Sequence, residues 1–188
     1  LKYETAEALG RELVKMDLEK GLIKTHIPAI DDAMYGGLMP GNFYGLIGLG
    51  GTYKSIIAQN IAYKNAIEDV PTLYLNGEMS SWQFYERLIW MAMGIDLRRE
   101  MVSKNLNEGT IDSFIDKLNT LTKRNIFVVN GNGFNKANIA STIQHIESTT
   151  GKIIRLIVID GVTQMDSAGK EEIPATIYNT SVAKEIAK

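Results

Sequence analysis

The fold is decided by one short stretch, Gly48-Leu49-Gly50-Gly51-Thr52-Tyr53-Lys54-Ser55. It fits the pattern GxxxxGK[S/T] except at Tyr53, which stands where the second fixed glycine is expected. An apolar run over 43–47, which predicts the first strand, precedes the stretch, and a helical pattern over 56–64 follows it. A strand that enters a glycine-rich turn and then a helix leaves backbone N–H groups pointing inward at the positive end of the helix dipole. The stretch therefore predicts a phosphate-binding loop.

The residue types of this loop suit a nucleoside triphosphate with Mg²⁺. Gly48, Gly50 and Gly51 can take positive φ values or allow a phosphate to approach the backbone closely. Lys54 supplies a mobile ammonium for the outer phosphates, and the Ser55 hydroxyl is placed to ligate Mg²⁺. We therefore expect residues 48–55 to bind ATP. The alternative is an ordinary glycine-rich turn followed by a surface lysine and serine.

Tyr53 is the irregular position of the loop. It adjoins the start of the following helix, where a helical φ is available to any residue. We therefore predict a helical φ at Tyr53 and a phenol ring turned away from the phosphates.

Composition favours a single soluble domain. A chain of 188 residues with 45% hydrophobic content can bury one sizeable core. The absence of cysteine excludes disulfides and thiol chemistry, and no apolar run approaches the roughly 18 residues that a membrane span needs. We expect a cytoplasmic protein. Its net charge of −2 gives no overall basic surface, so nucleic-acid contacts would use local loops.

Helical and strand patterns alternate after the loop. Strands are predicted at 72–75, 125–129 and 153–159, and an amphipathic helix at 111–121. Ser80 and Gln83 form a predicted capping box, and Asn135 can cap another helix. The run 153–159 is apolar almost throughout, which predicts a strand buried on both faces of a parallel sheet. The fold is therefore predicted to be α/β, a mainly parallel sheet with helices on both faces and the loop at the carboxyl edge of its first strand.

A polar helix is predicted near the amino terminus, over residues 3–19. Its apolar stripe is narrow and consists of Ala6, Leu9, Leu13 and Met16. Such a helix can pack on its own domain or dock on a neighbouring subunit.

Two acidic residues follow predicted strands. Asp160 ends the run Leu156-Ile-Val-Ile-Asp, so its carboxylate is predicted near the loop, where it can hold Mg²⁺ through water. Glu78 follows the strand at 72–75 and is predicted to act as general base by polarising the water that attacks the γ-phosphate. The alternatives are an Asp that caps the next turn and a Glu favoured by the following helix N-terminus.

The segment from Ile27 to Gly41, which leads into the loop, resembles the entry to RecA-like ATPase domains of DnaB-type replicative helicases and of their RadA and KaiC relatives. The loop, then Gly-Glu-Met-Ser after a strand, then Ile-Asp with Met165 shortly beyond, resembles the DnaB type most closely. The resemblance runs from about His26 to Lys188. It implies an ATP- and Mg²⁺-dependent motor that forms a hexameric ring on single-stranded DNA in DNA replication, in a bacterium or a phage-infected host.

Position by position, Lys54 resembles the Walker A lysine, Ser55 the Mg²⁺ ligand, Glu78 the catalytic glutamate and Asp160 the Walker B aspartate. The resemblance divides the chain into an amino-terminal helix and linker at 1–24, of the kind that docks on the next subunit in this family, and an ATPase core at 25–188.

The chain departs from the family at two places besides Tyr53. Thr163 stands where the family usually has a glutamine, and Gln164 comes one position later. The further strands, DNA-contacting loops and trans-acting arginine finger of the family have no counterpart, so we expect a truncated product or fragment. Because an arginine finger is worth about 10³–10⁵ in rate, this chain alone is predicted to bind nucleotide and turn it over slowly.

Three functions are compatible with these residues. The first is the motor core of a DnaB-like helicase. The second is another RecA-like ATPase, of the RadA or KaiC type, in recombination or signalling. The third is a nucleotide-binding module that has lost catalysis.

Overall fold

The computed structural model describes residues 5–7, 11, 21–104 and 106–161. Its contacts divide the chain into two compact units, residues 1–40 and 41–188, which are described separately. Most of the predicted helix at 3–19 and the whole of 162–188, including Thr163, Gln164 and Met165, lie outside the described residues.

The first unit is a compact turn around a short helix. Helix α2 spans Pro28–Ala33, and Ile23 and Leu38 form an isolated antiparallel bridge. Gly37 has a φ of +146°, and a Cβ there would lie 2.6 Å from the carbonyl oxygen of Ile23. The close approach of the two backbones therefore requires glycine at this position.

Asp31 fixes the segment that enters α2. Its Oδ1 accepts hydrogen bonds from the Thr25 backbone N–H at 2.8 Å and the Thr25 hydroxyl at 2.7 Å, and its Oδ2 accepts one from the His26 N–H at 3.1 Å. Burial alone would raise the pKa of Asp31, but these hydrogen bonds outweigh it and hold the pKa below its usual value. The carboxylate is thus the anchor of this turn.

The second unit is built on a parallel sheet. Within the described part of the chain, the sheet has three strands, β1 (Thr72–Asn76), β2 (Ile126–Asn130) and β3 (Leu156–Asp160), in the order β2-β1-β3. The register places Asn76 opposite both Asn130 and Asp160. The last residues of all three strands therefore lie side by side at the carboxyl edge.

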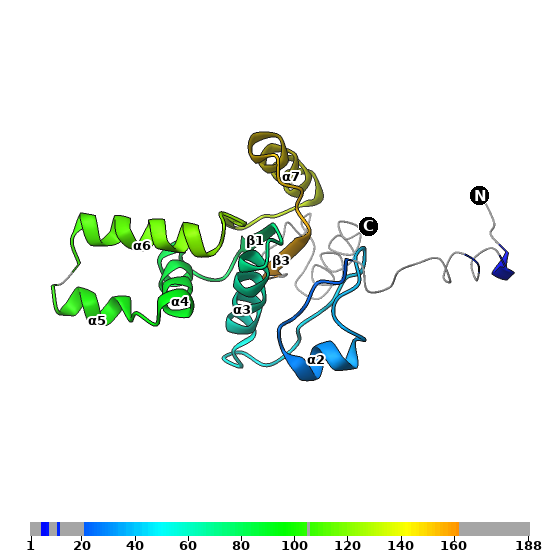
Figure 1. Cartoon of the computed structure of the whole chain (residues 1–188), viewed down its shortest axis with the longest axis horizontal. Helices are drawn as coiled ribbons and strands as arrows, with labels where there is room; N and C mark the ends of the chain where they lie inside the picture. Colours follow the sequence, from blue (N-terminus) through cyan, green and yellow to red (C-terminus); the bar gives the residue numbers. More distant parts are fainter. Residues whose placement is uncertain (1–4, 8–10, 12–20, 105, 162–188) are drawn as a thin grey trace. The chain divides into compact units, whose positions relative to one another are not determined.

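Helices cover both faces of this sheet, as predicted (Figure 1). Helices α3 (Lys54–Ile67) and α4 (Ser81–Met93) lie on one face and α7 (Lys136–Thr150) on the other, while α5 (Leu97–Val102) and α6 (Glu108–Leu121) pack on α4. Successive strand residues point to opposite faces, so Tyr74 packs with α3 and α4, whereas Leu73 and Leu75 pack with α7. The α/β prediction is confirmed.

The helix starts follow the predicted capping chemistry. At α4, the Ser80 hydroxyl accepts the Gln83 N–H and the Gln83 side chain accepts the Ser80 N–H, which completes a capping box. At α7, the Asn135 side chain accepts the Asn138 N–H at 3.0 Å. Local sequence therefore fixes where both helices begin.

The prediction of a strand at 43–47 was wrong. Residues 42–49 form no strand, and Ile47 is 94% exposed. The physical reason is that a strand needs a hydrogen-bonded neighbour, and the pairing recorded among the described residues joins β1 only to β2 and β3. The loop is consequently preceded by an extended segment rather than by a sheet strand.

The prediction for 153–159 needs a second correction. Strand β3 begins at Leu156, Ile153 is 72% exposed, and four of the five β3 residues are only half-buried. In the part of the chain that the structure describes, β3 pairs on one side, with β1, so it lies at an edge of the sheet. The strand buried along its full length is β1.

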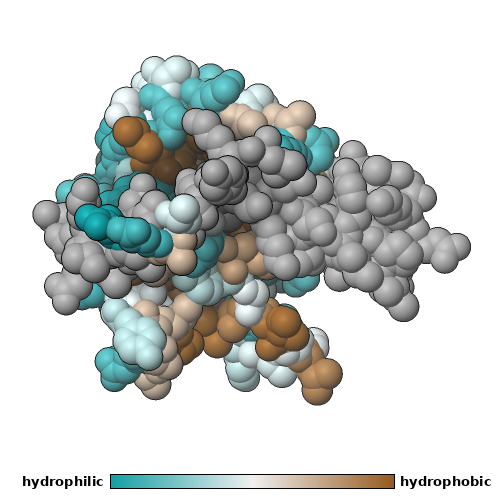
Figure 2. All heavy atoms as spheres, turned by 90° about the vertical axis from the view of Figure 1, so that its right-hand side faces the viewer, coloured by the Kyte–Doolittle hydropathy of each residue, from teal (hydrophilic) through white to brown (hydrophobic). Residues whose placement is uncertain are grey.

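Large apolar side chains contribute to the surface of the molecule, and hydrophobic atoms are visible on the face that Figure 2 presents. Among the most exposed of them in the second unit are Ile47, Leu49 and Tyr53, which belong to the loop and the segment before it. The loop is therefore an accessible part of this unit.

Candidate nucleotide-binding site

The predicted loop is a tight turn that closes around its own lysine. The Lys54 ammonium donates to the carbonyl oxygens of Gly48 at 2.9 Å and of Leu49 at 2.6 Å. The Thr52 hydroxyl donates to the Leu49 carbonyl at 2.7 Å. A Cβ at Gly48 would lie 2.8 Å from the Thr52 hydroxyl oxygen, so the turn has no room for a side chain there. The turn therefore holds a positive charge on its inner side.

The glycines of the loop differ in what the backbone requires of them. Gly51 has a φ of +75°, a region that favours glycine. At Gly48, a side chain would displace the Thr52 hydroxyl, which lies 2.8 Å from an added Cβ. Gly50 has neither a positive φ nor a neighbour within 4 Å of an added Cβ. The open space beside Gly50 leaves room for a phosphate to approach the backbone.

Tyr53 differs from its prediction. It is the N-cap residue of α3 and has a φ of 62° and a ψ of 17°, which is the left-handed region rather than a right-handed helical conformation. Helix α3 begins at Lys54, directly after Tyr53, and Tyr53 keeps the left-handed conformation that glycine adopts most readily. The phenol ring is 72% exposed. Its orientation relative to bound phosphates stays a prediction.

The strain at Tyr53 leads to a stability prediction. A non-glycine residue in the left-handed region costs about 1–2 kcal/mol, and the greater freedom of glycine in the unfolded chain offsets part of this. We therefore expect Tyr53→Gly to be more stable than Tyr53→Ala by about 0.5–1 kcal/mol. Urea denaturation of the two variants measures the difference. Equal stability of both variants would contradict the left-handed conformation at this position.

The two predicted Mg²⁺ ligands lie together. The Ser55 hydroxyl, in the first turn of α3, donates to Asp160 Oδ1 at 3.0 Å, although the residues are 105 positions apart in the sequence. Asp160 ends β3 and is 9% exposed. A hydroxyl and a carboxylate are hard oxygen ligands of the type that Mg²⁺ takes together with substrate phosphates. The donor set therefore fits a magnesium–nucleotide site.

The loop that carries Glu78 is fastened to the same edge. Asn76 is buried, and its side-chain amide donates to the Met79 carbonyl at 2.8 Å and to Asn130 Oδ1 at 2.6 Å. The Gly77 N–H donates to the Asp160 carbonyl at 3.0 Å. Glu78 itself is exposed, and its carboxylate makes no hydrogen bond to another described residue. The structure thus brings the loop of Glu78 to the end of β3 and leaves the carboxylate accessible.

This edge combines a turn with an inward ammonium, paired oxygen ligands and an accessible carboxylate. A family model described as the DnaB-like helicase C-terminal domain matches residues 22–188. The chain belongs to the DnaB-like helicase C-terminal domain family.

Two further proteins are similar to this chain. The ATPase domain of G40P superposes with a TM-score of 0.71 at 19% identity, and the match covers 100% of this chain and 68% of that one. At this identity the match establishes the fold, which is RecA-like. The UPF0273 protein MJ1359 of Methanocaldococcus jannaschii is 30% identical over 109 residues, which are 57% of this chain and 43% of that protein. The match to that relative therefore spans less than half of its length.

The resemblance to the DnaB type predicts roles for Lys54, Ser55, Glu78 and Asp160, but it predicts none for Tyr74. Tyr74 lies in the middle of β1, is fully buried, and donates its hydroxyl to Asp160 Oδ2 at 2.8 Å. Burial, together with the neighbouring Asp160 carboxylate, raises the pKa of the Tyr74 phenol far above its usual value. The phenol is therefore a neutral donor. The one sequence signal for it is a hydroxyl-bearing side chain within an otherwise aliphatic part of a buried strand.

Arg87 of α4 lies beside the Glu78 loop. Its guanidinium is half-buried and contacts the Met79 sulfur at 2.8 Å. The positive charge of Arg87 lowers the pKa of the Tyr74 phenol and the negative charge of Glu78 raises it, and both effects are smaller than those of burial and of Asp160.

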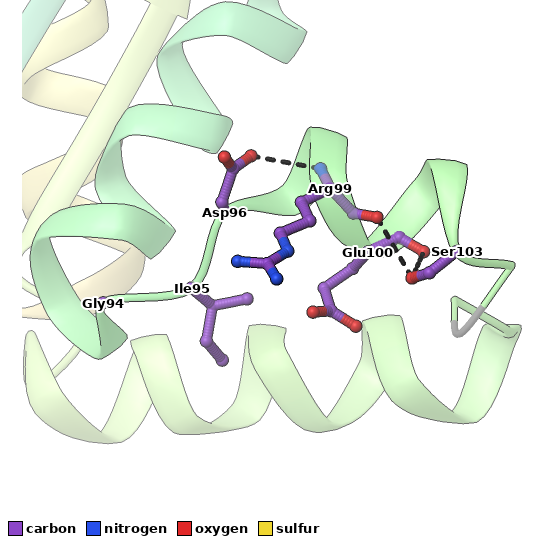
Figure 3. Close-up of a pocket in the computed structure, with 6 residues that line it drawn as sticks. All are labelled: Gly94, Ile95, Asp96, Arg99, Glu100 and Ser103. Atoms are coloured by element: carbon purple, nitrogen blue, oxygen red, sulfur yellow. Dashed lines mark hydrogen bonds between the residues drawn. The ribbon is translucent and has the colours of Figure 1, made fainter.

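A separate hollow lies beside α5 (Figure 3). Polar groups of the hollow cap the two ends of α5. Asp96 Oδ1 accepts a hydrogen bond from the Arg99 N–H at 3.1 Å, and the Ser103 hydroxyl donates to the carbonyls of Arg99 and Glu100. None of its lining residues belongs to the phosphate loop or to the ends of the strands. We do not assign it to the nucleotide.

Among the described residues, no helix is long and apolar enough to cross a bilayer. The same residues contain no cluster of three His, Cys, Asp or Glu side chains that could hold a metal ion.

Proposed function

We propose that this chain is the ATP-binding and ATP-hydrolysing motor core of a DnaB-like replicative helicase. The observation that carries the proposal is the 3.0 Å contact between the Ser55 hydroxyl and Asp160 Oδ1, because it joins the start of α3 to the end of β3 at the loop. The family assignment favours the DnaB type over RadA or KaiC relatives.

Residues 48–55 hold the phosphates of ATP in this proposal. Backbone N–H groups at the start of α3 and the Lys54 ammonium supply positive charge to the phosphate oxygens. Ser55 and Asp160 would hold Mg²⁺, which when bound would neutralise part of the negative charge on the phosphates. In support, Lys54 already directs its ammonium toward the inner side of the turn, where it contacts Gly48 and Leu49.

Glu78 acts as the general base in this proposal. Its carboxylate accepts a proton from the water that attacks the γ-phosphate and orients that water. Two features support the role: the side chain is exposed, and its loop is fastened to Asp160 through Gly77. A general base needs access to the attacking water, which the exposed side chain allows, and its loop is tied to the end of the strand that carries Asp160.

The family suggests that the protein binds single-stranded DNA and assembles with further copies of itself into a ring. The division of the chain into an amino-terminal segment at 1–24 and an ATPase core at 25–188 is likewise a proposal. A catalytically silent nucleotide-binding module is the competing function, and the observation that favours it is the tyrosine at position 53, where the motif has glycine.

One experiment separates these functions. ATP hydrolysis by the protein at its full natural length is measured with and without single-stranded DNA, and unwinding of a forked duplex is measured in parallel. We expect DNA to stimulate hydrolysis and ATP to drive unwinding. Hydrolysis without unwinding would favour a RadA or KaiC type of activity. Nucleotide binding without hydrolysis would favour the silent module.

A further inference from the structure

The Asp160 carboxylate is held by two hydroxyls, one on each oxygen. Oδ1 accepts from Ser55 at 3.0 Å, and Oδ2 accepts from Tyr74 at 2.8 Å. Asp160 is 9% exposed, so a carboxylate rotated away from these donors would lose hydrogen bonds without gaining full contact with water. Its orientation is therefore fixed by the two hydroxyls together.

Tyr74 is itself rigid. It is 0% exposed and lies in the central strand, with Val128 and Val158 opposite it in the neighbouring strands. Its ring packs against Phe84, with the ring centroids 4.8 Å apart and the planes inclined by 58°. Because close packing holds the phenol in one rotamer, its hydroxyl has a fixed position and donates to Asp160 Oδ2.

We infer that Tyr74 is a positioning residue for the magnesium site. By occupying Oδ2, it leaves Oδ1 as the oxygen that faces Ser55 and a cation held there, so that Asp160 acts through one oxygen in a fixed direction. This inference rests on the proposed function, because it concerns the Mg²⁺ that accompanies ATP. Tyr74 touches neither nucleotide nor metal in this scheme and works through Asp160.

A purely structural role for Tyr74 predicts a different result. If the hydroxyl served only to satisfy a buried carboxylate, its removal would lower stability and leave the response of nucleotide binding to Mg²⁺ unchanged. If it positions Asp160, its removal changes that response even in a folded protein.

The test uses the 188-residue chain with Tyr74→Phe. Binding of a fluorescent ATP analogue is titrated with Mg²⁺ and, separately, in excess EDTA. We expect the Mg²⁺ concentration for half-maximal binding to rise about 3- to 10-fold, which corresponds to the net worth of one hydrogen bond, with affinity in EDTA unchanged. An unchanged Mg²⁺ response would overturn the inference.

Tyr63→Phe is the matched control. Tyr63 lies on α3 in the same apolar cluster and is 7% exposed, and its hydroxyl makes no hydrogen bond to another described residue. We expect its Mg²⁺ response to equal that of the wild type. An equal shift in both variants would mean that removing either phenol perturbs the core, and the positioning role would be rejected.

Two substitutions with unnatural residues keep the test decisive if Tyr74→Phe does not fold. With 4-fluorophenylalanine at position 74 the shape is retained and the donor is lost, so the shift should appear. With 4-aminophenylalanine the donor is restored, so the Mg²⁺ response should return to that of the wild type; a persistent defect would contradict the inference. Binding by the wild-type chain tests the proposed function separately: if the wild type shows no Mg²⁺-dependent binding, the proposed function fails and the inference fails with it.

Discussion

Glu78→Gln should leave nucleotide binding intact and reduce ATP hydrolysis by about 10²- to 10⁴-fold, the usual contribution of a general base. Glutamine has nearly the shape of glutamate but does not accept a proton from water. The Glu78 carboxylate makes no hydrogen bond to another described residue, so the substitution removes the base without breaking a contact of the folded chain. The loss should therefore fall on turnover rather than on affinity.

The measurement uses the protein at its full natural length, with steady-state hydrolysis in the presence of single-stranded DNA and equilibrium binding of a fluorescent ATP analogue. Glu86→Gln is the control, because it removes a carboxylate from α4 that pairs with Arg98 and lies outside the site. We expect Glu86→Gln to hydrolyse ATP at the wild-type rate. Normal hydrolysis by Glu78→Gln would show that another group is the base.

Local signals were sufficient for most of the fold. The Ser80 and Gln83 pair was recognisable because a capping box is contained in four consecutive residues, and the same holds for the Asn135 cap. The buried strand at 72–76 was recognisable because it is short, apolar and followed at once by helix signals. Such features depend on neighbours in the sequence.

Strand pairing depends on distant parts of the chain, and there the sequence was misleading. The runs at 43–47 and 153–159 look equally apolar, yet only the second contains a strand, and it begins at Leu156. Apolar composition makes a strand possible, whereas a hydrogen-bonded neighbour makes it form. The exposed positions of Ile47 and Ile153 follow from the lack of such a neighbour among the described residues.

The residues of the site also fall into two groups, those predictable from local sequence and those that depend on the folded structure. Lys54, Ser55, Glu78 and Asp160 were predictable from residue types in a known order. Tyr74 was not, because its role depends on a hydroxyl that meets a carboxylate 86 positions away. Tyr53 was misjudged for a different reason: a helical φ was available to it, but the turn before α3 requires a left-handed residue. Backbone conformation at a single turn position is not encoded by the identity of that residue alone.

Lys54→Ala should weaken Mg²⁺–ATP binding by about 10- to 150-fold, since a hydrogen bond to a charged group is worth about 1.5–3 kcal/mol. The ammonium of Lys54 lies on the inner side of the turn and donates to the carbonyls of Gly48 and Leu49. A phosphate that enters the loop offers charged oxygens in place of these neutral carbonyls, so the exchange favours binding. Alanine leaves the phosphate charge uncompensated at this point.

Equilibrium titration with ATP and with AMP distinguishes loss of this charge from collapse of the loop. Because the ammonium serves the outer phosphates, the affinity loss should be large for ATP and small for AMP. Lys64→Ala is the matched control, since Lys64 is exposed in the last turn of the same helix α3. An equal loss for both nucleotides would indicate that Lys54 maintains the shape of the turn through Gly48 and Leu49, and the contact with the outer phosphates would then have to be assigned to another residue.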